Sequence, residues 1–168
     1  TEKAGIIKTG VPVVIGEKQE EIAAIFLEKA KETNSSLTFA DQELHTDHTA
    51  RNKEYLNTSI YKGPTVLYNN LELDLNGFYQ LKNVLTVLQS VTLLQNKGYS
   101  IADNHIYAAL KDVKVLTGLQ GRWQKLSEQP LIICDTGHNI SGITEVMQNI
   151  VKTEYEQLHM VIGMVKDK

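Results

Sequence analysis

The sequence contains little cysteine, no long apolar run and no concentration of one charge. A single cysteine among 168 residues excludes an internal disulfide framework, and we expect Cys134 to be a buried structural thiol. No apolar run approaches the roughly 20 residues that a helix needs to span a bilayer. The 17 basic residues are scattered and the net charge is −3, which argues against nucleic-acid binding. We therefore expect a cytoplasmic protein with neither a membrane nor a nucleic-acid partner.

An apolar segment that is followed at once by polar residues is the most informative feature. Pro130–Cys134 is continuously apolar, which is typical of a parallel strand covered on both faces. The strand should end at Asp135, Gly137 permits a tight turn, and Asn139 or Ser141 can cap a helix. The apolar positions of that helix follow a 3.6-residue repeat: Ile143, Val146, Met147 and Ile150. Loops of this kind bind ligands in open α/β sheets.

Three polar side chains of this region indicate a nucleotide site. Asp135 can accept hydrogen bonds from ribose hydroxyls or help to hold a cation, while Arg122 and His138 can face phosphate oxygens. The helix N-terminus behind the loop also favours anions. Ordinary roles stay open: Asp135 can cap the helix, His138 can be a surface residue, and Arg122 can pair with an acid. The convergence of the three side chains favours the nucleotide interpretation.

The first part of the chain predicts a β-α-β order. Residues 11–15 favour a strand, residues 18–32 a helix, and residues 35–40 a second strand. This order favours parallel pairing through a crossover helix. Residues 41–57 are polar, and we expect loop or irregular structure there.

Two further strands and two helices are predicted in the middle of the chain. The strands cover residues 59–68 and 71–75, and Asn69-Asn70 tolerates the positive φ of a two-residue hairpin turn. A broad apolar face after Gly77 predicts a mostly buried helix that ends at Gly98. Ser100 can cap the next helix.

Four segments, in order, match the signature of one enzyme family. Glu2–Val14 contains Glu-Lys-Ala-Gly-Ile-Ile-Lys, and Leu75–Asn83 contains Leu-x-Gly-x-Tyr-Gln-x-x-Asn. Gly121-Arg122 is followed by Asp-x-Gly-His-Asn at Asp135–Asn139. The chain ends in Val161–Lys168, an apolar run with a Gly and an Asp-Lys pair. Together the segments resemble the folylpolyglutamate synthase and dihydrofolate synthase family of the Mur ligase superfamily.

The resemblance implies a fold and a reaction. The fold class would be α/β. Residues 1–117 would form the C-terminal part of a Mur-ligase-type central ATPase domain, and residues 118–168 the first part of a Rossmann-like C-terminal ligase domain. The boundary near Thr117-Gly118 also falls in a stretch of little periodicity. The reaction would use ATP and Mg²⁺ to add L-glutamate to a folate or dihydropteroate acceptor through an acyl phosphate. We expect a monomer.

The resemblance also assigns roles to residues. Lys3 matches the catalytic lysine that superfamily members carry as a carbamate near magnesium, and His138 is the second catalytic candidate. Asn83, Arg122 and Asp135 would bind ATP. Simpler interpretations are that Lys3 is a solvated surface group and that Asn83 makes a local backbone hydrogen bond. Tyr79 replaces the usual His of the family, so the role of that His does not carry over.

Other features of the family are missing. No Gly-x-x-x-x-Gly-Lys-Ser/Thr phosphate loop occurs, so we expect an internal fragment that is inactive by itself and has no metal site of its own. The close spacing of His45, Asp47 and His48 is a poor zinc signal. Two alternatives stay open, namely another Mur-type amide ligase acting on muramyl peptides or cyanophycin, and a non-catalytic nucleotide-binding module. The choice between folate and dihydropteroate as acceptor is also open.

Overall fold

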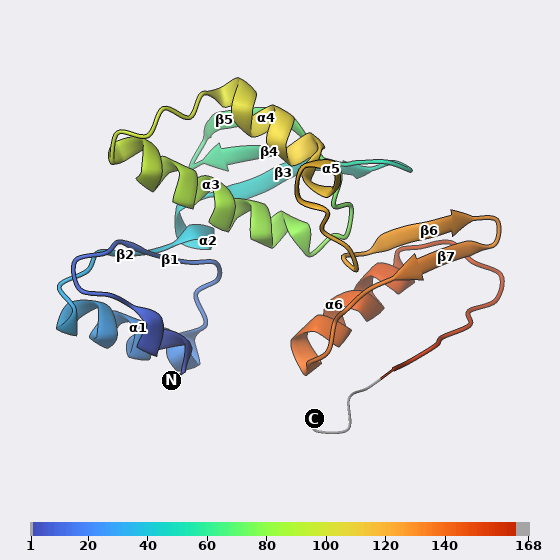
Figure 1. Cartoon of the computed structure of the whole chain (residues 1–168), viewed down its shortest axis with the longest axis horizontal. Coiled ribbons are helices and arrows are strands. Elements are labelled where there is room, and N and C mark those ends of the chain that lie inside the picture. The colour runs from blue at the N-terminus through green and yellow to red at the C-terminus, as the bar shows by residue number, and fades with distance from the viewer. Residues whose placement is uncertain (1, 164–168) are drawn as a thin grey trace.

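The computed structural model describes residues 2–163, which form three units in chain order (Figure 1). The first unit contains a 3₁₀ turn, η1 (Lys3–Ile6), and the elements β1 (Val13–Ile15), α1 (Glu20–Glu32) and β2 (Leu37–Phe39). β1 and β2 pair in parallel, with Val13 opposite Leu37, and α1 connects them. The predicted β-α-β order and its parallel pairing are confirmed.

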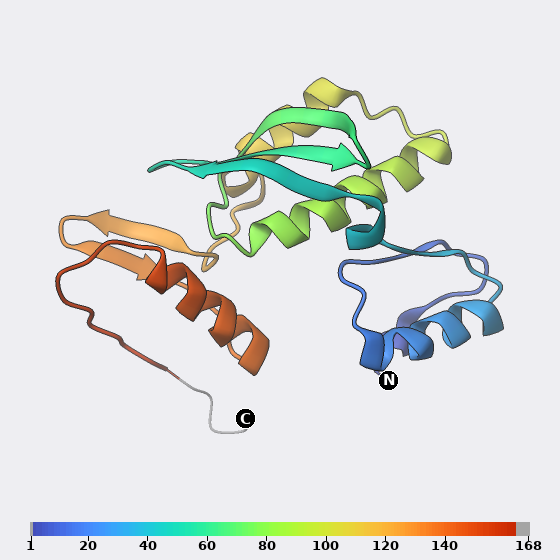
Figure 2. The ribbon, with the colours of Figure 1, turned by 180° about the vertical axis from the view of Figure 1, so that it is seen from behind.

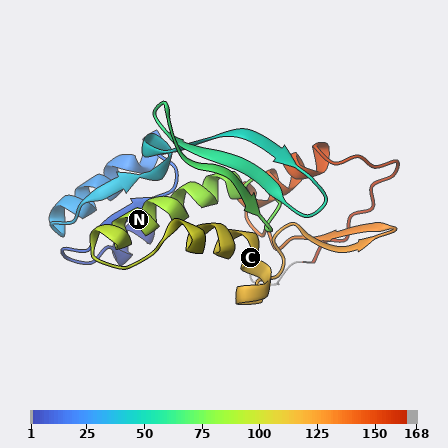
Figure 3. The same ribbon diagram turned by 90° about the horizontal axis from the view of Figure 1, so that it is seen from above.

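The second unit is a three-stranded antiparallel sheet with helices on one face (Figures 2 and 3). Its strands lie in the order β3-β4-β5. Its elements are α2 (Ala40–Glu43), β3 (His45–Arg51), β4 (Leu56–Lys62), β5 (Thr65–Leu73), α3 (Gln80–Asn96), α4 (Asp103–Lys111) and α5 (Val113–Thr117). The main core lies between the sheet and the helices α3 and α4; its large members are Leu56, Ile60, Leu71, Leu73, Val84, Leu85, Leu88 and Ile106.

The strand β3 was not predicted, since residues 41–57 read as loop or irregular structure. All but one of its seven residues are polar or charged, so the chain offers no alternating apolar pattern. The strand lies at the edge of the sheet, where β4 is its one neighbouring strand in the described part of the chain. An edge strand of this kind needs few buried side chains, so its sequence need not show the apolar alternation from which strands are predicted.

The predicted hairpin turn was also placed wrongly. The connection between β4 and β5 lies at Gly63-Pro64, where Gly63 has a φ of 54°. Asn69-Asn70 lies inside β5, and Asn70 has a φ of 52°. The Ser59 hydroxyl donates to Asn69 Oδ1 at 3.1 Å and accepts the Asn70 N–H at 3.0 Å, where the β4–β5 register shifts. The tolerance of Asn for positive φ is therefore used in a β-bulge.

The predicted long helix is α3, which is buried along one face only. Val84, Leu85 and Leu88 are buried, whereas Val87 is 45% exposed. The helix ends before Gly98, as predicted. The next helix begins after Ala102 and not after Ser100, and the Nδ1 atom of His105 accepts the Ala102 N–H at 3.3 Å. An imidazole therefore satisfies a backbone donor at the helix start for which a serine was expected.

The third unit is a hairpin followed by a helix: β6 (Gln124–Glu128), β7 (Leu131–Cys134) and α6 (Ile140–Val151). The predicted strand, its end before Asp135 and the following helix are confirmed. The expected parallel pairing was wrong, because β7 pairs antiparallel with β6. The two-residue connection between these strands permits only antiparallel pairing. Leu131 and Ile132 are 47% and 46% exposed, and Cys134 is half-buried where a buried thiol was expected.

The last described residues, Val161–Gly163, carry no regular secondary structure, and the Asp167-Lys168 pair of the family signature lies outside the described residues. The division of the chain near Thr117-Gly118 stays a prediction; it falls where α5 ends. Within residues 2–163, no helix combines the length and apolar character needed to cross a membrane.

Candidate functional site

The loop between β7 and α6 is built around the Asp135 carboxylate. Its Oδ1 atom accepts the Gly137 N–H at 2.8 Å, and its Oδ2 atom accepts the backbone N–H of Trp123 at 2.8 Å. The Asn139 side chain accepts the Gly142 N–H at 2.7 Å, so Asn139 is the predicted N-cap of α6. The carboxylate thus fixes the turn that Gly137 makes and ties this loop to the start of β6.

Arg122 reaches the same loop from the segment before β6. Its Nη1 atom donates to the Thr136 hydroxyl and to the carbonyl of Gly121, the latter at 3.3 Å. The Thr136 N–H also donates to the Gly121 carbonyl, at 3.0 Å. The guanidinium therefore lies beside the β7–α6 loop, as the sequence predicted, and it pairs with a hydroxyl instead of an acid.

His138 is exposed on the same loop. Its Nδ1 atom lies 3.1 Å from the carbonyl oxygen of Thr136. A carbonyl oxygen only accepts hydrogen bonds, so this contact requires a proton on Nδ1. Nε2 of the neutral imidazole is then left as an acceptor.

Tyr79 joins this loop to the start of α3. Its hydroxyl donates to Asp135 Oδ2 at 2.8 Å. Burial, followed by the hydrogen bond from the hydroxyl to Asp135, raises the pKa of Tyr79 well above its ordinary value. The sequence had singled out Tyr79 only as a departure from a family motif. Its contact with a residue 56 positions later was not predictable from local pattern.

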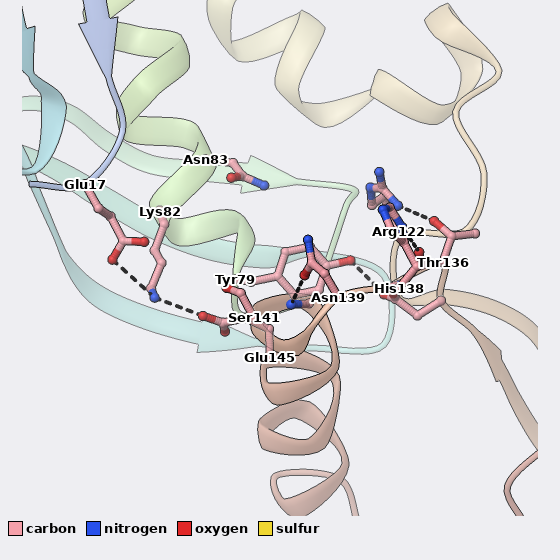
Figure 4. Close-up of a pocket in the computed structure, with 13 residues that line it drawn as sticks. Glu17, Tyr79, Lys82, Asn83, Arg122, Thr136, His138, Asn139, Ser141 and Glu145 are labelled. Carbon is pink, nitrogen blue, oxygen red and sulfur yellow. Dashed lines mark hydrogen bonds and ion pairs between the residues drawn. The ribbon is translucent and has the colours of Figure 1, made fainter. Parts of the chain in front are cut away.

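A second link crosses the site through Lys82, which sequence reasoning missed. Its ammonium lies 2.9 Å from a carboxylate oxygen of Glu145 on α6 and 3.3 Å from one of Glu17, which follows β1. The hydrogen bond with Glu145 is the main cause that raises the pKa of Lys82. One cation therefore bridges acids from two other parts of the chain (Figure 4).

These groups surround a pocket of about 280 Å³ between α3 and the β7–α6 loop (Figure 4). Four predicted site residues line it: Asn83, Arg122, Asp135 and His138. The other lining residues are Glu17, Tyr79, Lys82, Thr136, Gly137, Asn139, Ser141, Gly142 and Glu145. The fold thus gathers residues from four separated segments of the chain into one pocket.

Asn83 contributes an exposed amide to the pocket from the first turn of α3. Its Nδ2 atom donates to Gln80 Oε1 at 2.8 Å. This local bond is to a side chain, whereas the simpler interpretation expected a backbone partner. Its role toward ATP stays a prediction.

Lys3 is not among the residues that line this pocket. It is an exposed residue of the η1 turn, as expected for a solvated lysine. Its carbamylation stays a prediction.

No group of three or more His, Cys, Asp or Glu side chains within residues 2–163 is arranged to hold a metal ion. His45 stacks on Tyr61 with 5.5 Å between ring centroids, so it contributes to the surface of the sheet. Because the described residues do not form a magnesium site, none of them is assigned to Mg²⁺.

The chain is 26% identical over 167 residues to a folylpolyglutamate synthase of Lacticaseibacillus casei and 27% identical over 173 residues to a dihydrofolate synthase/folylpolyglutamate synthase of Bacillus subtilis. Each match covers 99% of this chain. The resemblance to this enzyme family is confirmed. The chain spans 38% of the length of these two relatives, and no family model matches it.

Solved folylpolyglutamate synthase structures share the fold. A complex with AMPPCP and folate aligns with a TM-score of 0.79 and 25% identity, covering 92% of this chain and 37% of that one. The synthetase from Lactobacillus casei aligns with a TM-score of 0.74 and 25% identity, covering 93% of this chain and 38% of that one. The predicted mixed α/β fold of the Mur ligase type is therefore confirmed.

Proposed function

We propose that this chain forms part of the ATP site of a ligase that adds L-glutamate to a folate or dihydropteroate acceptor. The observation that carries the proposal is the meeting of Asn83, Arg122, Asp135 and His138 in one pocket. Its support is the similarity to folylpolyglutamate synthases, one of which is described as a complex with AMPPCP, an ATP analogue, and folate.

The pocket has the donors and acceptors that a nucleotide needs. Arg122 would face phosphate oxygens, and His138 would do so as the imidazolium, in which Nε2 also carries a proton. The first turn of α6, which lines the pocket at Ser141 and Gly142, favours negative charge. Asp135 and the Asn83 amide offer partners for ribose hydroxyls or a base. The acids Glu17 and Glu145 share Lys82, so they compete little with the phosphates for Arg122.

The chemistry follows from what such a site would hold. ATP would supply the phosphoryl group that turns the acceptor carboxylate into an acyl phosphate, which the glutamate amine attacks with release of phosphate. The residues of this chain would bind and orient the nucleotide. Orientation of this kind is the main contribution of proteins to phosphoryl transfer.

The test is glutamate-dependent ATP hydrolysis by the full-length gene product, with dihydropteroate and tetrahydrofolate supplied separately. Arg122→Ala and Asp135→Ala should each lower kcat/KM for ATP by about tenfold or more, because each removes a charged hydrogen-bonding group. Lys62→Ala is the control, since Lys62 is an exposed cation that pairs with Glu43 and does not line the pocket. Absence of turnover with both acceptors would contradict the folate assignment.

A further inference from the structure

The Asp135 carboxylate is held by donors from three segments. Oδ2 accepts the Tyr79 hydroxyl and the Trp123 N–H, both at 2.8 Å, while Oδ1 accepts the Gly137 N–H at 2.8 Å. Trp123 and Gly137 are backbone donors from the unit that contains Asp135. Tyr79 is a side-chain donor that comes from the other side of the pocket.

The position of Tyr79 is itself fixed through its neighbour Phe78. The Phe78 N–H donates at 2.9 Å to Oδ1 of Asn149, which is fully buried in α6. The amide of Asn149 in turn donates to the Glu145 carbonyl at 2.9 Å. The Phe78 ring lies 4.6 Å from the guanidinium carbon of Arg51 and 4.2 Å from the Lys152 ammonium. The backbone that carries Tyr79 is therefore anchored to α6 independently of the tyrosine hydroxyl.

The Tyr79 hydroxyl is suited to a fixed donor role. Burial and the hydrogen bond with Asp135 raise the pKa of Tyr79, so its hydroxyl keeps its proton at neutral pH. Without this donor, the carboxylate would keep only the backbone N–H groups of Trp123 and Gly137, both from its own unit, and no donor from the α3 side of the pocket would fix its orientation. A ligand would then have to reorient it on binding.

We propose that Tyr79 is a positioning residue whose hydroxyl sets the orientation of the Asp135 carboxylate before a nucleotide binds. The inference rests on the proposed function, because it concerns the same pocket. Tyr79 acts here through Asp135, which is the residue proposed to contact the nucleotide.

Trp123 provides a test that needs no ligand. It is the only tryptophan of the chain, it is 6% exposed, and its N–H shares Asp135 Oδ2 with Tyr79. In the 168-residue chain, Tyr79→Phe should increase acrylamide quenching of Trp123 by at least about twofold, because the shared carboxylate becomes mobile. Tyr107→Phe is the matched control: the Tyr107 hydroxyl is likewise hydrogen-bonded, to the N–H and carbonyl of Asn69, and it does not line this pocket. Unchanged quenching in Tyr79→Phe would overturn the proposal.

A double-mutant cycle with ATP as the probe separates positioning from general stability. Calorimetry should show that Tyr79→Phe and Asp135→Ala each weaken ATP binding by about tenfold and that the double variant loses little more. Independent, additive losses would overturn the positioning role. If the unchanged chain does not bind ATP, the proposed function fails for this chain, and the Trp123 quenching result decides the positioning role alone.

Discussion

Gly121 has a φ of 69°, and a Cβ added to it would overlap the side chain of Thr136. Thr136 follows Asp135, and its hydroxyl accepts a hydrogen bond from Arg122. The close approach of Gly121 to Thr136 therefore brings Arg122 beside the loop that carries Asp135. Gly118 has a nearly identical φ of 67°, yet a Cβ there would meet nothing within 4 Å. A comparison of alanine variants at Gly118 and Gly121 therefore separates the free-energy cost of a left-handed backbone from that of the close contact with Thr136.

We predict that Gly121→Ala destabilises the protein by at least about 1 kcal/mol more than Gly118→Ala. Both replacements carry the left-handed penalty of about 1–2 kcal/mol, and only the first forces Thr136 to move. Urea unfolding of the two variants measures the difference. Equal losses would show that the Gly121–Thr136 approach is not a packing constraint.

Whether a site residue was predicted depended on how far along the chain its contacts lie. Arg122, Asp135 and His138 were predicted because they flank one recognisable strand, loop and helix. Lys82 and Asn149 were missed because their partners lie more than 60 residues away in the chain. Asn149 in particular is a polar residue of α6 that is fully buried, and its side chain accepts the N–H of the distant Phe78.

At the scale of elements, α6 is held at both ends. Asn139 caps its first turn, and at its other end the Arg51 Nη2 atom donates to the Lys152 carbonyl and the Thr153 hydroxyl, each at 3.2 Å. A cation at a helix C-terminus interacts favourably with the helix dipole. Arg51 belongs to β3, so the edge strand that sequence analysis missed supplies this contact.

Arg51→Ala should loosen α6 while leaving the sheet in place. The variant loses two hydrogen bonds to the helix end and the contact with the Phe78 ring, so amides of α6 should exchange with solvent about tenfold faster or more. Lys111→Ala is the control, since Lys111 also lies over an aromatic ring, that of Tyr55, and does not touch α6. Hydrogen exchange with peptide-level detection measures both. Equal exchange of α6 in the two variants would refute the contact.

Elements with a strong local pattern were predicted well. The helix α1, the strands β1 and β2, and the β7–α6 sequence each carry apolar periodicity or a helix cap in their own residues. The strand β3 and the β4–β5 turn lack such a local pattern. The strand is almost entirely polar, and the Asn-Asn pair that also fits a hairpin turn lies in a β-bulge instead. The antiparallel pairing of β7 depends on its partner strand, which the apolar run alone does not identify.

At the scale of the whole molecule, the three units meet at the pocket. Glu17 comes from the first unit, Lys82 and Tyr79 come from the second, and Asp135 and Glu145 come from the third. These polar contacts join parts of the chain whose apolar residues are packed mainly within the second unit. The protonation states of these side chains should therefore affect the free energy of unfolding.

Stability should fall as the pH rises above about 10, and Tyr79→Phe should make that fall shallower. The pKa of Tyr79 is raised in the folded state, so its contribution is constant below the unfolded pKa of about 10 and is lost progressively above it. The raised pKa of Lys82 acts in the same direction and in the same range. Urea midpoints measured between pH 8 and pH 11 test this, with Tyr107→Phe as control. Parallel curves for the unchanged chain and Tyr79→Phe would contradict the prediction.

The sequence by itself determined the α/β class, the family resemblance and the strand, loop and helix that carry Asp135 and His138. These features depend on periodicity, caps and motif spacing, which are local properties of the chain. Only the tertiary structure decided that Tyr79 holds Asp135, that Lys82 bridges Glu17 and Glu145, and that Asn149 is buried against Phe78. Such contacts arise from the packing of distant segments, and hydrogen bonding between them leaves no periodic trace in the sequence.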